Sequence, residues 1–129
     1  LVAGYSNIEL LGYQTEDKLK KYIQHAKAFV FAAEEDFGIM NVEALSCGTP
    51  VIAFNKGGAS ETITDNKTGI LFNSQTVDAV INAINRFEAD PSLFNPKELN
   101  NFAKQFDRKI FEKKFSDFVN NKCSEFFNK

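Results

Sequence analysis

The sequence predicts an α/β fold in which a parallel β-sheet is flanked by helices. Apolar segments at residues 28–32 and 51–54 are short and continuous, which is typical of strands covered on both faces. Segments in which apolar residues recur at helical spacing lie between and after them. Strands that alternate with helices are expected to form a parallel sheet.

The chain is long enough for one domain with a buried core. It has 129 residues, of which 43% are hydrophobic and 25% are charged, as in an ordinary globular protein. Its formal net charge of −2 gives no basic surface for nucleic acid. Cys47 and Cys123 favour neither a disulfide framework nor a zinc site. Because no apolar run is long enough to cross a bilayer and no signal-peptide pattern opens the chain, we expect a cytoplasmic protein.

The first elements are expected to be a strand, a helix and a second strand. Residues 8–12 are apolar and end in a glycine, which predicts a short strand. Thr15 is a candidate N-cap for a helix over residues 16–27, because acidic residues in the first turn favour the helix dipole. The buried strand at residues 28–32 follows.

The central part of the chain is expected to contain a helix, a strand and a short helical turn. Residues 39–47 form the helix, with Gly48 just beyond its end. Residues 51–54 form a buried strand, and Ser60 is a candidate cap for a helical turn at residues 61–63.

The rest of the chain supplies the fourth expected strand, at residues 70–72, after turn-forming residues. Beyond it only helices are expected. Thr76 is a candidate N-cap for a helix through residue 87, and Pro96 suits the first turn of a helix through residue 106.

Residues 35–52 carry the pattern that points to chemistry. Glu35 and Glu43 are eight positions apart, around a Phe-Gly turn at the start of the expected helix. A helix N-terminus offers backbone N–H groups and partial positive charge to a phosphate group. A carboxylate can accept hydrogen bonds from two neighbouring hydroxyls. The segment therefore suits a ligand that carries phosphate and hydroxyl groups.

This segment resembles the donor-binding half of family 4 glycosyltransferases, which are retaining enzymes of the GT-B architecture. The resemblance rests on the string E-x-F-G-x4-E-A-L-x-x-G-x-P-V-I at residues 35–52, with G-G-A-S-E at 57–61 and T-G-I-L-F at 68–72. It implies a Rossmann-like parallel sheet flanked by helices, with C-terminal helices, over residues 1–129. That unit would be a donor-binding domain, incomplete on its N-terminal side and without the acceptor domain. The string is most similar to bacterial mannosyltransferases of surface-polysaccharide assembly.

The resemblance implies roles for individual residues. Glu35 is expected to be the catalytic residue beside the reacting sugar, and Glu43 to bind the ribose of the nucleotide. The backbone N–H groups that would receive the sugar and diphosphate belong to Phe37, Gly38, Ile39 and Met40. Gly57 and Gly58 are candidates both for donor contact and for a tight turn. Glu61 and His25 are expected to be surface or structural residues.

The resemblance also implies a reaction. The parent enzyme is expected to transfer a hexose from a nucleotide diphosphate sugar, with GDP-mannose as the first expectation, to a saccharide or lipid-linked acceptor with retention. No cofactor and no metal are implied, because no D-x-D carboxylate pair appears. This chain alone is expected to be inactive. The alternatives are a non-catalytic nucleotide-sugar binding module and a GT-B epimerase or hydrolase acting on a nucleotide sugar.

Aromatic residues along the last helix have three interpretations. Core packing is the default for rings at helical spacing. In the resembling family, such a helix often crosses to the other half of the enzyme. Neighbouring lysines favour peripheral contact with the inner face of the cell membrane as a third interpretation. The residues are Phe111, Phe115, Phe118, Val119 and Phe126.

Overall fold

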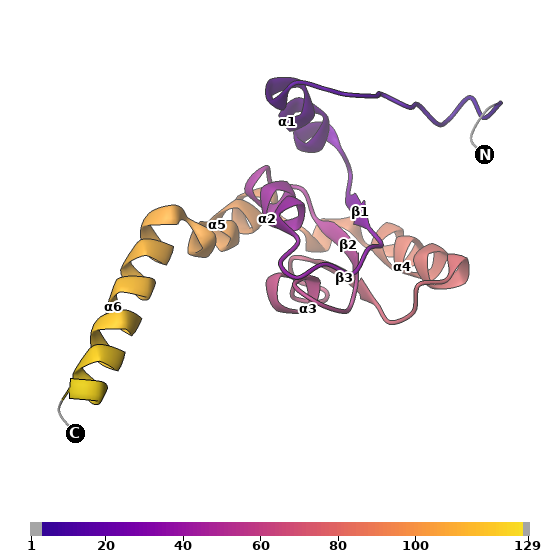
Figure 1. The fold of residues 1–129 in the computed structure, drawn as a ribbon. Helices are drawn as coiled ribbons and strands as arrows, with labels where there is room; N and C mark the ends of the chain where they lie inside the picture. Colours follow the sequence, from indigo (N-terminus) through magenta and orange to yellow (C-terminus); the bar gives the residue numbers. More distant parts are fainter. Residues whose placement is uncertain (1–3, 128–129) are drawn as a thin grey trace.

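A three-stranded parallel sheet lies at the centre of the molecule, with α2, α3 and α4 packed against it (Figure 1). The computed structural model describes residues 4–127. The strands are β1 (Phe29–Phe31), β2 (Val51–Phe54) and β3 (Gly69–Phe72), in the spatial order β1-β2-β3. The predicted α/β fold with a parallel sheet flanked by helices is confirmed.

Six α-helices and two short 3-10 turns precede, connect and follow the strands of residues 4–127. Thr76 caps one of these helices as predicted, since its Oγ1 accepts a hydrogen bond from the Ala79 N–H at 3.3 Å. The elements are α1 (Glu16–His25), α2 (Ile39–Ser46), α3 (Ala59–Thr62), α4 (Val77–Ala89), η1 (Pro91–Leu93), α5 (Pro96–Ala103), η2 (Lys104–Phe106) and α6 (Arg108–Phe127).

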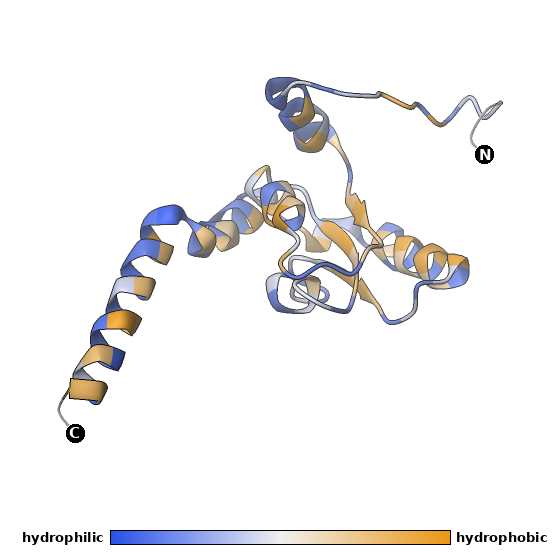
Figure 2. Ribbon diagram, in the orientation of Figure 1, coloured by the Kyte–Doolittle hydropathy of each residue, from blue (hydrophilic) through white to orange (hydrophobic). Residues whose placement is uncertain are grey.

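The hydrophobic core surrounds the middle strand. All four residues of β2 are buried, and because neighbouring side chains of a strand point to opposite faces, both faces of β2 are covered. Leu45 of α2, Ile70 of β3 and Leu99 of α5 are each at most 1% exposed. Figure 2 shows this concentration of apolar residues in the sheet. Burying each such side chain contributes about 1.5–3 kcal/mol to folding, so the core holds α2 firmly against the sheet.

The strand predicted at residues 8–12 is wrong. This segment is irregular, Leu10 is 78% exposed, and Figure 1 shows the segment running away from the body of the molecule. A strand needs a hydrogen-bonded neighbour, and no strand of residues 4–127 lies beside it. The structure therefore has three strands in its described part, where the sequence predicted four.

The prediction that β1 is covered on both faces is also wrong. Val30 is 46% exposed, whereas Phe29 and Phe31 are half-buried. Within the described chain β1 pairs only with β2, so it lies at an edge of the sheet. An apolar run in the sequence could not distinguish an edge strand from a central one.

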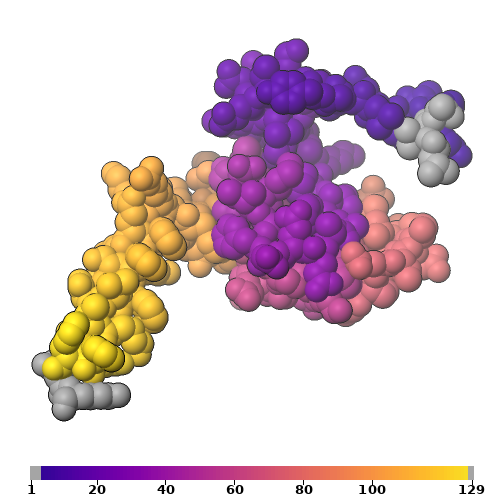
Figure 3. Space-filling model, in the orientation of Figure 1, coloured from indigo at the N-terminus to yellow at the C-terminus, as the bar shows by residue number. Residues whose placement is uncertain are grey.

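The aromatic residues of α6 do not pack in the core of the structure. Phe111, Phe115 and Phe118 are exposed, and α6 projects from the body (Figures 1 and 3). Helical spacing indicates that the rings share a side of the helix, but it does not say what lies against that side. The core-packing interpretation is therefore wrong for this structure.

Local details differ at three other positions. Ser60 lies inside α3, which begins after Gly58, so it does not cap the helix. Its hydroxyl donates instead to the Gly57 carbonyl at 2.7 Å. Residues 104–106 form a 3-10 turn rather than the end of α5. The chain leaves the helical conformation at Ala26, so α1 ends two residues before the predicted position.

A buried hydroxyl attaches α1 to the core. Thr49 is 2% exposed, and its Oγ1 donates a hydrogen bond to the Ile23 carbonyl at 2.6 Å. We expect Thr49→Val to lower the free energy of unfolding by about 1 kcal/mol, because the hydrogen bond is lost while the volume is kept. Thermal denaturation measures this change. Thr64→Val, at an exposed position, is the matched control, and equal melting temperatures for both variants would contradict the expectation.

Candidate functional site

The candidate site lies at the edge of the sheet where the three parallel strands end. In open α/β sheets, ligands bind outside the carboxyl ends of the strands. Hydrogen bonds join the loops at this edge. The Gly58 N–H, after β2, donates to the Glu35 carbonyl, after β1, at 2.8 Å. The Gln75 side chain, after β3, donates to the Ala32 carbonyl at 2.8 Å.

The N-terminus of α2 opens at this edge. Gly38 is its N-cap, with a left-handed backbone (φ 70°, ψ 58°), and no side chain caps the helix. The Asn41 N–H donates to the Gly38 carbonyl at 2.9 Å. Among residues 4–127, the N–H groups of Gly38, Ile39 and Met40 have no hydrogen-bond acceptor. These donors and the helix dipole together favour an anion at this position.

Gly57 and Gly58 bring the β2–α3 turn directly against the loop before α2. A Cβ atom on Gly57 would collide with the Glu35 carbonyl, and one on Gly58 with the Phe37 carbonyl. Gly57 also has a positive φ of 58°, whereas Gly58 has an ordinary helical φ of −60°. Gly58 is therefore required for close approach alone. Contact of either glycine with a donor stays a prediction.

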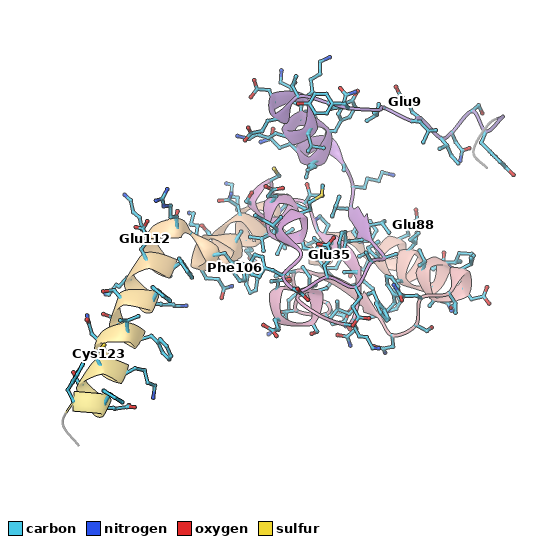
Figure 4. All side chains as sticks on the ribbon, viewed as in Figure 1. Glu9, Glu35, Glu88, Phe106, Glu112 and Cys123 are labelled. Atoms are coloured by element: carbon cyan, nitrogen blue, oxygen red, sulfur yellow. The ribbon has the colours of Figure 1, made fainter. Side chains whose placement is uncertain are left out.

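The two predicted carboxylates are exposed and flank the α2 N-terminus along the chain. Glu43 lies one turn after Ile39, so both residues share one exposed face of α2. Helical side chains tilt toward the N-terminus, so the Glu43 side chain lies over the first turn of α2. Glu35 lies in the preceding loop, and Figure 4 places it in the body of the molecule, far from Glu112 and Cys123 on α6. Binding of a ligand by these carboxylates stays a prediction.

The side chains of the predicted N–H donors have different surroundings. The Phe37 ring is 48% exposed and packs edge-on against Phe106, with 6.0 Å between ring centroids. Ile39 is 61% exposed, whereas Met40 is half-buried. Phe37 therefore anchors the loop to the η2 turn.

Sequence reasoning assigned no role in the site to two residues at this edge. Asn41 is 0% exposed, and neither its Oδ1 nor its Nδ2 has a hydrogen-bond partner. Lys56 lies in the turn after β2, with its Nζ 5.9 Å from the centre of the Phe54 ring, and brings a positive charge to this edge. The available signals were an asparagine within an apolar helical segment and a lysine before the glycine pair.

A hollow among the described residues lies elsewhere. It has a volume of about 620 Å³ and is lined by Ala26, Gly48 and Pro50, which precede the strands, and by Phe87 and Phe94. It therefore lies at the opposite edge of the sheet and contributes nothing to the α2 site.

Residues 4–127 contain neither a cluster of metal-binding side chains nor a helix suited to crossing a membrane. No group of three or more His, Cys, Asp and Glu side chains in this range is placed to hold a metal ion. In the same range, no helix combines the length and apolar character needed to cross a membrane.

Known proteins resemble this chain in sequence and in structure. Residues 4–108 match the family described as glycosyl transferases group 1. Over 77 residues the chain is 42% identical to the GDP-mannose-dependent alpha-(1-6)-phosphatidylinositol monomannoside mannosyltransferase of Mycolicibacterium smegmatis. That match covers 52% of this chain and 20% of the mycobacterial protein.

Two solved structures share the arrangement of elements. Sucrose-phosphate synthase from Thermosynechococcus elongatus superposes with a TM-score of 0.74 at 28% identity, over 91% of this chain and 30% of the synthase. HepE from Anabaena, solved in complex with UDP, superposes with a TM-score of 0.65 at 25% identity, over 78% of this chain and 29% of HepE. The chain thus spans about a fifth of the mycobacterial relative and under a third of these structures.

Proposed function

The chain belongs to the glycosyl transferases group 1 family, and on that premise we propose that it is the donor-binding part of a hexosyltransferase. The whole enzyme transfers a hexose from a nucleotide diphosphate sugar to a saccharide or lipid-linked acceptor, with retention of the anomeric configuration. The observation that carries this proposal is the α2 N-terminus, with unpartnered N–H groups at Gly38, Ile39 and Met40 and a carboxylate residue on either side in the chain.

The diphosphate of the donor binds at the N–H groups of α2. Transfer breaks the bond between the sugar and the diphosphate, so negative charge grows on the leaving group. The helix dipole and the N–H groups stabilise that charge most strongly when it is fully developed, which lowers the barrier.

The two carboxylates bind the two ends of the donor. Glu43 accepts hydrogen bonds from the ribose hydroxyls, because an ionised carboxylate accepts from two neighbouring hydroxyls at once. Glu35 lies beside the reacting sugar, where its negative charge stabilises the positive charge that develops at the anomeric carbon.

The proposed donor is GDP-mannose. The mycobacterial relative is named as a GDP-mannose-dependent mannosyltransferase, which supports mannose as the sugar. The UDP complex of HepE makes a uridine nucleotide the alternative to test. Surface-polysaccharide assembly remains the proposed setting.

We also propose that α6 contributes to peripheral membrane contact at the inner face of the cell membrane. The exposed rings of Phe111, Phe115 and Phe118 support this, together with Lys113 and Lys114 beside them. Such contact would bring a lipid-linked acceptor to the enzyme.

Titration of the ¹⁵N-labelled chain with GDP-mannose tests the donor site. We expect the backbone amide signals of Gly38, Ile39 and Met40 to shift on binding, and UDP-glucose to produce smaller shifts at equal concentration. Glu43→Gln should weaken the affinity about 10–100-fold, because charge-assisted hydrogen bonds to the ribose are worth about 1.5–3 kcal/mol.

Glu61→Gln is the matched control for this titration, since Glu61 is exposed on α3, and it should keep the affinity of the unmodified chain. Two results would contradict the proposal: amide shifts confined to another part of the chain, or no binding of either nucleotide sugar. Hydrolysis or epimerisation of the donor by a full-length enzyme without acceptor would favour the alternative enzyme classes.

A further inference from the structure

At the α2 N-terminus of the described chain, the side chain of Asn41 is polar but buried without a hydrogen-bond partner. It is 0% exposed, and both polar atoms of its amide lack a hydrogen-bond partner among the described residues. Buried amides in folded proteins are nearly always hydrogen-bonded, because removing them from water without compensation is costly. An apolar residue at position 41 would make the unliganded chain more stable.

The amide is directed toward the helix N-terminus. A Cβ built on Gly38 would lie 2.8 Å from the Asn41 Nδ2 and 3.5 Å from its Cγ. The amide therefore occupies the space that a side chain at position 38 would need. It lies beneath the N-cap whose N–H groups have no acceptor.

Gly38 lies directly over the Asn41 amide. Gly38 has a left-handed backbone, and glycine passes readily between that conformation and others. The Gly38 carbonyl already accepts a hydrogen bond from the Asn41 backbone N–H, so the N-cap and Asn41 are directly connected. A strained or unsatisfied group at a binding site is expected where the ligand completes the interaction.

We propose that Asn41 is a positioning residue for the nucleotide diphosphate sugar. Binding of the diphosphate at the α2 N-terminus adjusts the backbone of Gly38, which then becomes the hydrogen-bond partner of the Asn41 amide. The amide is unpaired in the free chain and paired in the bound one, so it favours the bound conformation. The inference rests on the proposed donor site.

The proposal predicts opposite changes in stability and affinity. In the free chain, replacing the amide with an apolar group removes two buried polar atoms that have no hydrogen-bond partner, which stabilises the fold. In the bound chain, the same change removes a hydrogen bond, which weakens binding. We expect Asn41→Val to raise the melting temperature and to weaken GDP-mannose binding at least 5-fold. Asn41→Ala, which cannot overpack beneath Gly38, should weaken binding to a similar extent.

Thermal denaturation and titration with GDP-mannose measure both quantities in the 129-residue chain. Asn82→Val, at an exposed position of α4, is the control for the chemical change and should alter neither. The side-chain NH₂ signal of Asn41, assigned by its absence in Asn41→Ala, gives a readout independent of any variant's stability. It should shift when GDP-mannose saturates the chain.

The outcomes separate this inference from the proposed function. If the unmodified chain binds GDP-mannose with amide shifts at residues 38–40, while the NH₂ signal stays fixed or both variants keep full affinity, the role of Asn41 is overturned and the donor site stands. Absence of binding by the unmodified chain overturns the donor site itself.

Discussion

Glu35→Gln is expected to lower the kcat of a full-length transferase containing this chain by about 10²–10³-fold, the size of effect seen when one electrostatic stabiliser is removed from an active site. The reason is that the positive charge at the anomeric carbon exists mainly in the transition state. Glutamine keeps the size of the side chain and removes the charge. KM for the donor should therefore change far less than kcat.

Glu34→Gln is the matched control, because Glu34 is the neighbouring exposed residue in the same loop. Steady-state transfer assays with GDP-mannose should show nearly unchanged kcat for this variant. If the large loss appeared with Glu34→Gln instead, the alignment of the motif would be off by one residue. A loss confined to KM in Glu35→Gln would mean that Glu35 binds the donor without acting on the reaction.

Gly58→Ala is expected to disrupt the site through the fold. A methyl group on residue 58 would enter the Phe37 carbonyl, and the Gly58 N–H would lose its 2.8 Å hydrogen bond to the Glu35 carbonyl. Overpacking costs about 1–3 kcal/mol and the lost hydrogen bond about 1 kcal/mol. We expect a lower free energy of unfolding in urea denaturation and displaced amide signals over residues 35–39.

Gly12→Ala provides the comparison, because Gly12 has a positive φ of 60° but no atom within 4 Å of its would-be Cβ. That variant carries only backbone strain, away from the site. It should leave the signals of residues 35–39 in place. Similar signal changes in the two variants would show that the contact between residue 58 and the loop is unimportant.

The glycine pair shows which features the sequence pattern predicts and which only the structure reveals. The string G-G indicated a turn, and the turn is present. Only the coordinates show that Gly57 needs its positive φ while Gly58 needs room, since the second requirement depends on a loop about twenty residues away in the chain. A contact between distant segments leaves no local trace in the sequence.

Asn41 and α6 also show the limit of prediction from sequence, the first for a buried residue and the second for an exposed helix. The sequence predicted a helix over residues 39–47. It did not predict that the Asn41 amide is buried beneath Gly38 without a hydrogen-bond partner among residues 4–127, because that depends on how α2 packs on the sheet. The spacing of the rings in α6 correctly implied that they lie on one side of the helix. It led to a wrong expectation of burial, because spacing carries no information about the neighbouring surface.

Local chemistry alone was enough to establish the α/β class, the positions of α2, β2 and α4, and the motif of residues 35–52, since periodicity, capping and turn residues act over a few positions. Tertiary packing determined that residues 8–12 form no strand, that β1 is an edge and that the loops after β1 and β2 meet at one surface. These features depend on which segments become neighbours in space, and hydrogen bonding and burial between distant segments settle that only when the chain folds.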